Sequence, residues 1–316
     1  MSRKVPPNAP FFIVMNAGSG GRDADTREQV IGDVLSRAGR SYRLWRVGKS
    51  TGIADAAREA VRLARQQEGI VVAAGGDGTI NAVAQELLGT GCTLGVLPQG
   101  TFNYFGRSHG IPLDTVEAVE ALVRGRLQPV QVGLVNDKVF LVNGSVGLYP
   151  RILEKREAHK QMFGRTKLVA LLSALVTMLT PPPQLVLTLH GGDNPSMLHI
   201  STLLVENNPL QLEEVGLPES DAVQKGELAA VAVKAKGVWQ MLGVLALAAM
   251  RRLRDSEKVV SFPFALLTVQ PLRRRRIKVA TDGEITWQLP PLVFKAVPQG
   301  LLLIVPDQQG EGKGAP

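Results

Sequence analysis

The sequence predicts an α/β domain followed by an antiparallel β-sandwich domain. From residue 10 to about 130, strand-like apolar runs alternate with helical patterns across short connections. This order is typical of a parallel sheet flanked by helices. After residue 130 short β-branched runs follow one another, as in an antiparallel sandwich. We therefore place the first domain at residues 9–133 and the second at 134–297.

Each element of the first domain follows from its hydrophobic pattern. Apolar runs with strand length or strand alternation predict strands at 11–15, 42–47, 69–74 and 93–97. Apolar residues that recur on one helical face predict helices at 26–38, 52–66 and 79–88.

The second domain is predicted to consist mainly of strands. After residue 130, strands are expected at 130–135, 139–143, 185–189, 198–205, 228–233, 259–262, 266–269, 277–280, 292–297 and 301–305. Two helical segments, about 151–179 and 238–254, interrupt them, and the tail 307–316 is expected to be disordered.

Composition limits the class of protein. The chain has 316 residues, of which 45% are hydrophobic and 20% charged, as in a globular protein with a sizeable core. Cys92 is the only cysteine, so no intramolecular disulfide can form, and its apolar surroundings predict a small buried side chain. No apolar stretch reaches the roughly 18 residues of a membrane span. We expect a cytoplasmic protein.

The net charge of +8 includes two arginine-rich clusters, at 251–254 and 273–276. Two interpretations stay open: a solvated basic surface, or a patch that faces anionic lipid headgroups. The helical segments 151–179 and 238–254 are either core helices or helices that rest on a bilayer, and Trp239 favours the second reading. Nucleic acid is not expected, because no binding motif is present. A homodimer is left open.

A glycine-rich run between a buried strand and a helix is the first candidate site. It consists of Gly75, Gly76, Asp77, Gly78 and Thr79. Glycines let the backbone approach a phosphate, and a helix N-terminus offers free N–H groups to it. Asp77 would hold Mg²⁺, directly or through water, and Thr79 would cap the helix or contact phosphate. The alternative is a tight turn with an aspartate cap.

Two further polar loops follow neighbouring strands. Residues 16–22 follow the first strand, and Gly100, Thr101, Phe102 and Asn103 follow the fourth. The carboxyl ends of parallel strands meet at one edge of a sheet, so the three loops are expected to converge on one crevice.

The second domain contains the sequence Asp282-Gly283-Glu284 after a predicted strand. Phosphoryl transfer to a hydroxyl needs a positioned carboxylate that accepts the alcohol proton. Glu284 is a candidate for that role. The alternative is an ordinary hairpin turn.

Together these motifs resemble the diacylglycerol kinase catalytic domain family, in particular soluble bacterial lipid kinases related to sphingosine and ceramide kinases. Residues 16–20 stand at the family's Asn-Pro-x-Ser-Gly loop, with Ala17 in place of proline. Residues 75–79 match its signature, and residues 98–103 are similar to its Pro-x-Gly-Thr-x-Asn stretch. Further landmarks are found at 143–148, 207–210 and 282–284.

The resemblance implies a phosphofructokinase-like and NAD-kinase-like first domain, to which residues 298–306 return, and a lipid-binding sandwich. It implies ATP and Mg²⁺ as cofactors, with Asp77 in the Mg-ATP site and Glu284 as general base. The implied nucleotide-binding residues are Asn16, Ser19, Gly20, Thr51, Gly75, Gly76, Asp77, Gly78, Thr79, Gly100, Thr101 and Asn103.

The chain departs from the family's pattern at a second metal site. Many relatives have an aspartate where this chain has Tyr104, and an Asp-Gly-x-Leu-Asp pattern where it reads Lys225 to Ala229. In some members those acids hold a structural Mg²⁺, so we expect that site to be absent here.

The sequence therefore predicts an ATP-dependent lipid kinase that contacts an anionic membrane surface transiently. The acceptor is left open among diacylglycerol, sphingoid bases, ceramide and phosphatidylglycerol. One alternative is an NAD kinase, although residues 100–104 lack the Gly-x-Asn-x-Gly stretch of those enzymes. The other is a non-catalytic lipid- or nucleotide-binding relative, which Tyr104 and Lys225 support.

Overall fold

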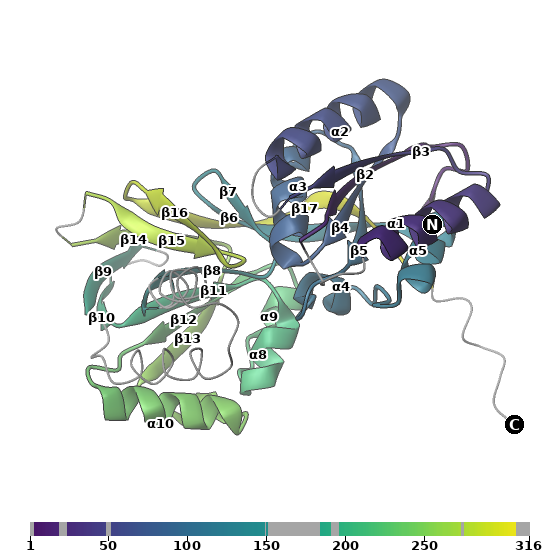
Figure 1. The fold of residues 1–316 in the computed structure, drawn as a ribbon. Coiled ribbons are helices and arrows are strands. Elements are labelled where there is room, and N and C mark those ends of the chain that lie inside the picture. The colour runs from purple at the N-terminus through teal and green to yellow at the C-terminus, as the bar shows by residue number, and fades with distance from the viewer. Residues whose placement is uncertain are drawn as a thin grey trace, which may run out of the picture. The chain divides into compact units, whose positions relative to one another are not determined.

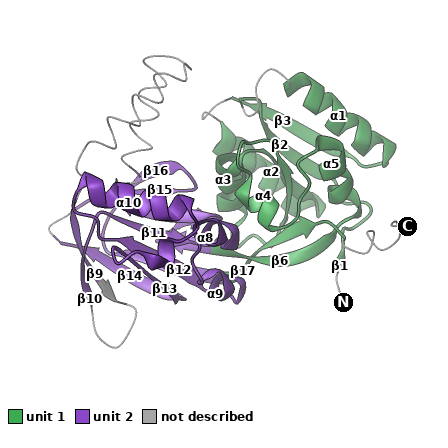
Figure 2. Ribbon diagram, turned by 90° about the horizontal axis from the view of Figure 1, so that it is seen from below, with its two compact units in different colours: residues 1–132, 298–316 green, residues 133–297 purple. Residues whose placement is uncertain are grey.

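The structure is a computed structural model that describes residues 3–18, 24–48, 52–148, 150, 184–190, 196–272 and 275–307. Ser19, Gly20, Thr51, the predicted helix at 151–179 and the tail from residue 308 lie outside the described residues. The chain forms two compact units, residues 1–132 with 298–316 and residues 133–297 (Figure 2).

The first unit is built on a parallel sheet with the strand order β17-β5-β4-β2-β3. The strands are β2 (Phe11–Asn16), β3 (Tyr42–Val47), β4 (Ile70–Gly75) and β5 (Thr93–Pro98), joined by the end of β17 (Leu292–Val305). A short strand, β1 (Arg3–Lys4), pairs with β6 (Arg126–Val135). Figure 1 labels β2 to β6, β17 and the helices of this unit.

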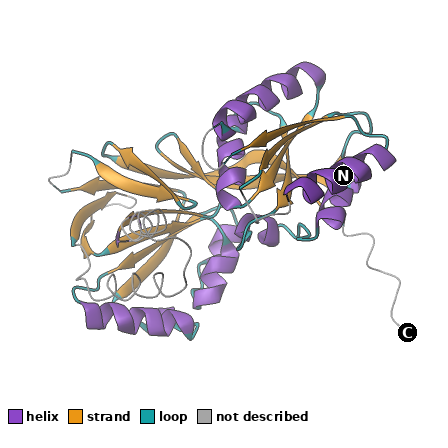
Figure 3. Cartoon of the chain, viewed as in Figure 1, coloured by secondary structure: helices purple, strands orange, loops and turns teal. Residues whose placement is uncertain are grey.

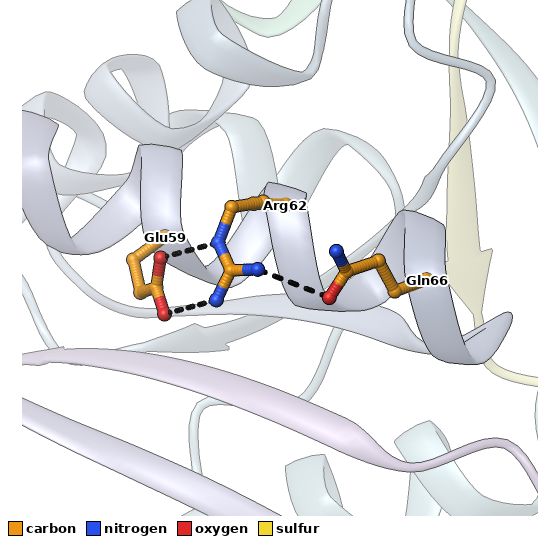
Figure 4. A network of polar contacts seen from close by, with 3 residues as sticks. All are labelled: Glu59, Arg62 and Gln66. Carbon is orange, nitrogen blue, oxygen red and sulfur yellow. Dashed lines mark hydrogen bonds and ion pairs between the residues drawn. The ribbon is translucent and has the colours of Figure 1, made fainter.

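Helices cover both faces of this sheet because successive side chains of a strand point to opposite sides. Helices α1 (Ala24–Arg37) and α5 (Thr115–Arg124) share one apolar core with alternate residues of β2 and β4. Helices α2 (Ile53–Gln67) and α3 (Asp77–Leu87) pack together, and α4 (Tyr104–Ser108) follows β5. The outer face of α2 is polar and carries the network of Glu59, Arg62 and Gln66 drawn in Figure 4.

The second unit contains a six-stranded antiparallel sheet with the order β13-β12-β11-β8-β15-β16. Its strands are β8 (Asn143–Gly147), β11 (Thr202–Glu206), β12 (Leu228–Val233), β13 (Val259–Phe264), β15 (Ile277–Thr281) and β16 (Glu284–Gln288). Strands β9 (Leu185–His190), β10 (Ser196–Ile200), β14 (Leu266–Pro271) and the first half of β17 form a second layer, and β7 (Lys138–Phe140) pairs with β6.

Side chains from both layers of the second unit form one core. Val146, Leu203 and Val279 come from the six-stranded sheet, and Leu187 and Phe294 come from the other layer. This packing is that of a β-sandwich. The predicted fold class, an α/β domain followed by an antiparallel sandwich, is confirmed (Figure 3).

Three of the helices that the structure describes pack on the outer face of the six-stranded sheet. They are α8 (Pro209–Val215), α9 (Ser220–Gln224) and α10 (Val238–Ala249), and a 3₁₀ turn, η1 (Leu253–Asp255), follows. The predicted helix at 238–254 therefore ends too late, since Arg251 adopts a left-handed φ of 56°. Helices α8 and α9 were missed because each is too short to show a helical period.

The structure divides two predicted strand runs and joins two others. The run 139–143 divides into β7 and β8, because the Asp282 carboxylate accepts the backbone N–H groups between them. The run 198–205 divides at Ser201, whose N–H and hydroxyl both donate to the Val233 carbonyl. The runs 292–297 and 301–305 form the single strand β17, with Gln299 at a φ of 69°.

Candidate functional site

The first polar loop of unit 1 is tied to the glycine-rich helix start. At the end of β2, the Asn16 amide nitrogen donates to the Thr79 hydroxyl at 3.0 Å. The Asn16 amide oxygen accepts the Gly18 N–H at 2.9 Å, which turns the chain back on itself. Asn16 therefore positions residues 16–18 beside α3.

The glycines of the second and third loops allow these loops to touch. A Cβ on Gly100 would lie 2.7 Å from the Cα of Gly76, and one on Gly75 would lie 2.6 Å from the Thr79 side chain. The Gln99 N–H donates to the Gly75 carbonyl at 2.8 Å, so the loops are also hydrogen-bonded. Close packing thus explains these glycines before any ligand is considered: Gly76 and Gly100 meet at the backbone, and Gly75 leaves room for the Thr79 side chain.

Asp77 joins the glycine-rich loop to the third loop. It is the first residue of α3 and is half-buried. Its carboxylate accepts the N–H of Tyr104 at 3.3 Å and that of Phe105 at 3.2 Å, and so caps α4. Asn103 precedes α4 with a left-handed φ of 50°, and its amide binds both the N–H and the carbonyl of Gly100.

The predicted cap of α3 by Thr79 is wrong. Helix α3 begins at Asp77 with Gly76 as its N-cap residue, and Thr79 is buried within the first turn, where it accepts the Asn16 amide. The alternative reading, an aspartate cap, is true of Asp77, but the capped helix is α4.

The structure gathers nine predicted nucleotide-binding residues on these three loops of unit 1 and the start of α3. They are Asn16, Gly75, Gly76, Asp77, Gly78, Thr79, Gly100, Thr101 and Asn103. Next to them is an aromatic pair that the sequence reasoning missed: Phe102, which is 57% exposed, stacks on Tyr104 with 5.7 Å between ring centroids. The Arg107 guanidinium lies over the Tyr104 ring.

In unit 2 the Asp282-Gly283-Glu284 turn connects β15 to β16. Asp282 adopts a φ of 48°, and its carboxylate accepts the N–H groups of Leu141, Val142 and Asn143 at 2.7, 2.9 and 2.9 Å. Asp282 is therefore a structural anchor for the segment between β7 and β8.

Glu284 is the first residue of β16 and is exposed overall. Desolvation of its carboxyl group nevertheless raises the pKa of Glu284 above its ordinary value, and the positive charge of Lys138 partly opposes that rise. A carboxylate with a raised pKa is a better proton acceptor than an ordinary glutamate.

Glu206 is a buried acid that the sequence reasoning did not single out. It ends β11, where Asn143 of β8 and Ala229 of β12 are its neighbours in register, and only 7% of it is exposed. Burial, and secondarily the charge of Asp282, raise the pKa of Glu206 to about 8. The sequence signal that could have identified Glu206 is its place at the end of a strand that is otherwise uncharged.

Two residues that interrupt the family's pattern occupy ordinary structural positions. The Tyr104 N–H is bound by Asp77, and Lys225 is an exposed residue at the end of α9. Among the residues that the structure describes, no cluster of three or more histidine, cysteine, aspartate or glutamate side chains could hold a metal ion.

A hollow of about 780 Å³ in unit 1 lies away from the candidate site. Gly69 and Thr93, which line it, stand at the amino ends of β4 and β5. Open parallel sheets bind ligands at the opposite, carboxyl edge, where the three loops lie. We therefore assign no ligand to this hollow.

Residues 10–135 match the family model of the diacylglycerol kinase catalytic domain. This segment belongs to that family. A probable lipid kinase YegS-like of Klebsiella pneumoniae (strain 342) is 35% identical over 143 residues, which cover 44% of this chain and 46% of the relative. A diacylglycerol kinase of Bacillus subtilis (strain 168) is 40% identical over 95 residues, 29% of this chain and 31% of the relative. The chain thus spans less than half the length of these curated relatives.

The fold similarity extends further than the sequence similarity. A crystal structure of a putative diacylglycerol kinase from Bacillus anthracis str. Sterne superposes with a TM-score of 0.72 at 18% identity. The alignment covers 94% of this chain and 96% of that chain. At this identity it shows a shared fold. The diacylglycerol kinase catalytic domain segment holds the three loops and Asp77, whereas Glu206, Asp282 and Glu284 lie beyond it.

No described helix is long and apolar enough to cross a membrane.

Proposed function

We propose that this protein is an ATP-dependent lipid kinase that transfers the γ-phosphate of ATP to a lipid hydroxyl. The observation that carries the proposal is Asp77 at the start of α3, joined by hydrogen bonds to the loop after β5. This carboxylate stands at a helix N-terminus, an end that favours anions, within the segment that matches the diacylglycerol kinase catalytic domain.

The donor groups of this loop cluster fit a triphosphate with a divalent cation. The first N–H groups of α3 would bind phosphate oxygens, and Asn16 would keep residues 16–18 in place beside them. Each Asp77 carboxylate oxygen accepts one backbone N–H, which leaves further lone pairs for Mg²⁺ or its bound water. Mg²⁺, when bound, would offset the charge of the phosphates.

Three further nucleotide contacts are proposed from the sequence. Ser19, Gly20 and Thr51 are proposed nucleotide contacts outside the described residues. Tyr104 and Lys225 supply no carboxylate, so we propose no second, structural Mg²⁺.

Glu284 is the proposed general base. Its carboxylate would accept the proton of the acceptor hydroxyl as that oxygen attacks the γ-phosphate. The pKa of Glu284 is raised by desolvation and so lies closer to neutral pH than that of an ordinary glutamate. Diacylglycerol is the first acceptor to test, since relatives bear that name, and sphingoid bases are the second.

Phosphate transfer from radiolabelled ATP to a mixed lipid extract, with the product identified by mass spectrometry, tests the proposal. Asp77→Asn and Glu284→Gln should each lower turnover by about 100-fold or more. Glu284→Gln should leave the thermal unfolding temperature nearly unchanged, whereas Asp77→Asn keeps one acceptor oxygen for the N–H groups of Tyr104 and Phe105 and should lower it modestly. The matched controls Asp33→Asn and Glu257→Gln alter exposed acids and should retain activity. Full activity in both site variants overturns the assignment.

The same assay separates the alternatives. Turnover with NAD in place of lipid would favour an NAD kinase. Nucleotide binding without turnover across all lipids would favour a non-catalytic relative.

A further inference from the structure

Helix α10 lies on the outside of unit 2 (Figure 1). It exposes an apolar face. Its twelve residues include no charged side chain. Val244 is its one buried residue, and it packs with Leu212, Leu217 and Val231 on the outer face of the sheet. The opposite side of α10 is therefore left to solvent.

The exposed side of α10 carries an apolar arc. Trp239, Ala246 and Met250 follow one another at helical spacing along its centre, and Leu245 lies to one side. Trp239 is 86% exposed, Met250 57% and Leu245 44%. Gln240, the polar side chain of the helix, is exposed beside these apolar residues, and its amide oxygen accepts the Lys236 N–H at 2.8 Å.

Basic residues stand at both ends of this arc. Lys234 and Lys236 precede the helix, and Arg251, Arg252 and Arg254 follow it. Between residues 234 and 258 there are six basic and two acidic side chains. Asp255, one of the two acids, is paired with Arg252 at 2.7 Å, so the segment keeps a positive surface.

We propose that α10 is a membrane-docking helix whose apolar face enters the headgroup region of an anionic bilayer, with the basic residues at its two ends on the lipid phosphates. Twelve residues extend about 18 Å along a helix, too short to cross a bilayer but suited to lie in its plane. Tryptophan is enriched at this depth, and long basic side chains reach the headgroups from it.

Charge decides against a second copy of the chain as the occupant of this face. Two α10 helices packed together, in either direction, would bring basic ends against basic ends, which is unfavourable. An anionic lipid surface complements both ends, and each basic residue near it contributes about 1 kcal/mol. The inference rests on the proposed function in one respect: membrane docking would bring a lipid kinase to an acceptor that lies in the bilayer.

Co-sedimentation with vesicles, in the absence of ATP, tests the docking surface separately from catalysis. The full chain should bind vesicles of phosphatidylcholine with about a third phosphatidylglycerol, bind phosphatidylcholine alone weakly, and lose binding as salt rises. Trp239→Ser with Met250→Ser should lower partitioning about tenfold or more, and Lys236→Gln with Arg254→Gln several-fold. Trp287→Ser, which alters a 61% exposed tryptophan on β16, is the matched control and should bind as the unmodified protein does.

A second measurement avoids reliance on the serine variants. Brominated phosphatidylcholine in the vesicles should quench tryptophan emission of the unmodified protein, and the conservative Trp239→Phe variant should lose most of that quenching. Equal vesicle binding by the α10 variants and the unmodified protein, or unchanged quenching in Trp239→Phe, overturns the proposal. A dimer in sedimentation equilibrium that Trp239→Ser dissociates overturns it in favour of a second copy.

Activity on a short-chain, water-soluble acceptor separates this proposal from the kinase proposal. An α10 variant should retain that activity and lose only activity on vesicles. Absence of any transfer with normal vesicle binding would refute the kinase proposal and leave the docking helix intact.

Discussion

The backbones of Gly76 and Gly100 are in close contact, so that a Cβ on Gly100 would lie 2.7 Å from the Cα of Gly76. The two glycines belong to loops that follow the adjacent strands β4 and β5. Their contact holds the glycine-rich helix start against the loop that Asp77 binds. In this protein Gly76 and Gly100 therefore also serve the packing between loops.

Gly100→Ala should destabilise the first unit and weaken any nucleotide binding. The added methyl group would meet the Gly76 backbone and the Asn103 side-chain oxygen at 2.8 Å, neither of which can move without breaking the loop contact. We expect a loss of about 1–3 kcal/mol in the free energy of unfolding, measured by urea denaturation. Gly48→Ala is the control, since a methyl group there meets nothing within 4 Å. Equal stability of the two variants would refute this account.

Asp282→Ala should destabilise the sandwich unit strongly. The substitution leaves the N–H groups of Leu141, Val142 and Asn143 without their acceptor, at an expected cost of about 3 kcal/mol or more. Asp282→Asn keeps one acceptor oxygen, so its stability should lie between those of the unmodified protein and Asp282→Ala. Thermal unfolding followed by circular dichroism measures the series, with the exposed Asp221→Asn as control. A wild-type melting temperature for Asp282→Ala would contradict the anchoring role.

Glu206 should make the folded state less stable as pH rises from about 4.5 to about 8. Burial raises the pKa of Glu206 to about 8, so below pH 4.5 both folded and unfolded states carry the proton. Between these values the unfolded chain releases the proton and the folded chain keeps it, which favours unfolding. In Glu206→Gln, folding no longer requires a proton to bind at this position. The free energy of unfolding at neutral pH should therefore rise, by an amount on the order of several kcal/mol.

Denaturant titrations at several pH values check the Glu206 prediction. The Glu206→Gln variant should show a flatter dependence of unfolding free energy on pH, with its largest gain above pH 8. Glu257→Gln, an exposed substitution, should leave the unmodified dependence in place. A Glu206→Gln protein that is less stable than the unmodified one at pH 8 would show that the ionised carboxylate has a favourable partner.

Lys138→Met should move the acidic limb of the pH–activity profile to higher pH, if Glu284 is the base. The Lys138 charge lowers the pKa of Glu284 against the effect of desolvation, so its removal lets that pKa rise. A higher pH is then needed to ionise the carboxylate and reach full turnover. Kinase assays from pH 5 to 9 measure the limb. Lys295→Met, an exposed change in the same unit, should not move it. If the acidic limb of Lys138→Met stays in place, the ionisation of Glu284 does not control turnover.

Several elements of the fold could be predicted because their patterns are local. Continuous apolar runs identified β2 and β4, and one-sided helical patterns identified α1 and α2. The change of texture near residue 130 distinguished the α/β part from the sandwich. The boundaries of β7, β8 and β11 could not be read in this way, since hydrogen bonds to the distant residues Asp282 and Val233 end or divide those runs.

The sequence by itself determined which residue types stand at the carboxyl ends of the parallel strands, and hence where a phosphate site should be sought. Only the tertiary structure decided what these residues do for one another. Asp77 caps α4, Thr79 accepts a hydrogen bond from Asn16, and Gly76 meets Gly100, because β2, β4 and β5 are neighbours in one sheet. The burial of Glu206 and the free face of α10 likewise depend on which surfaces pack together. Hydrophobic periodicity records the side on which a residue lies, whereas its partners are set by strands and helices that are distant in the chain.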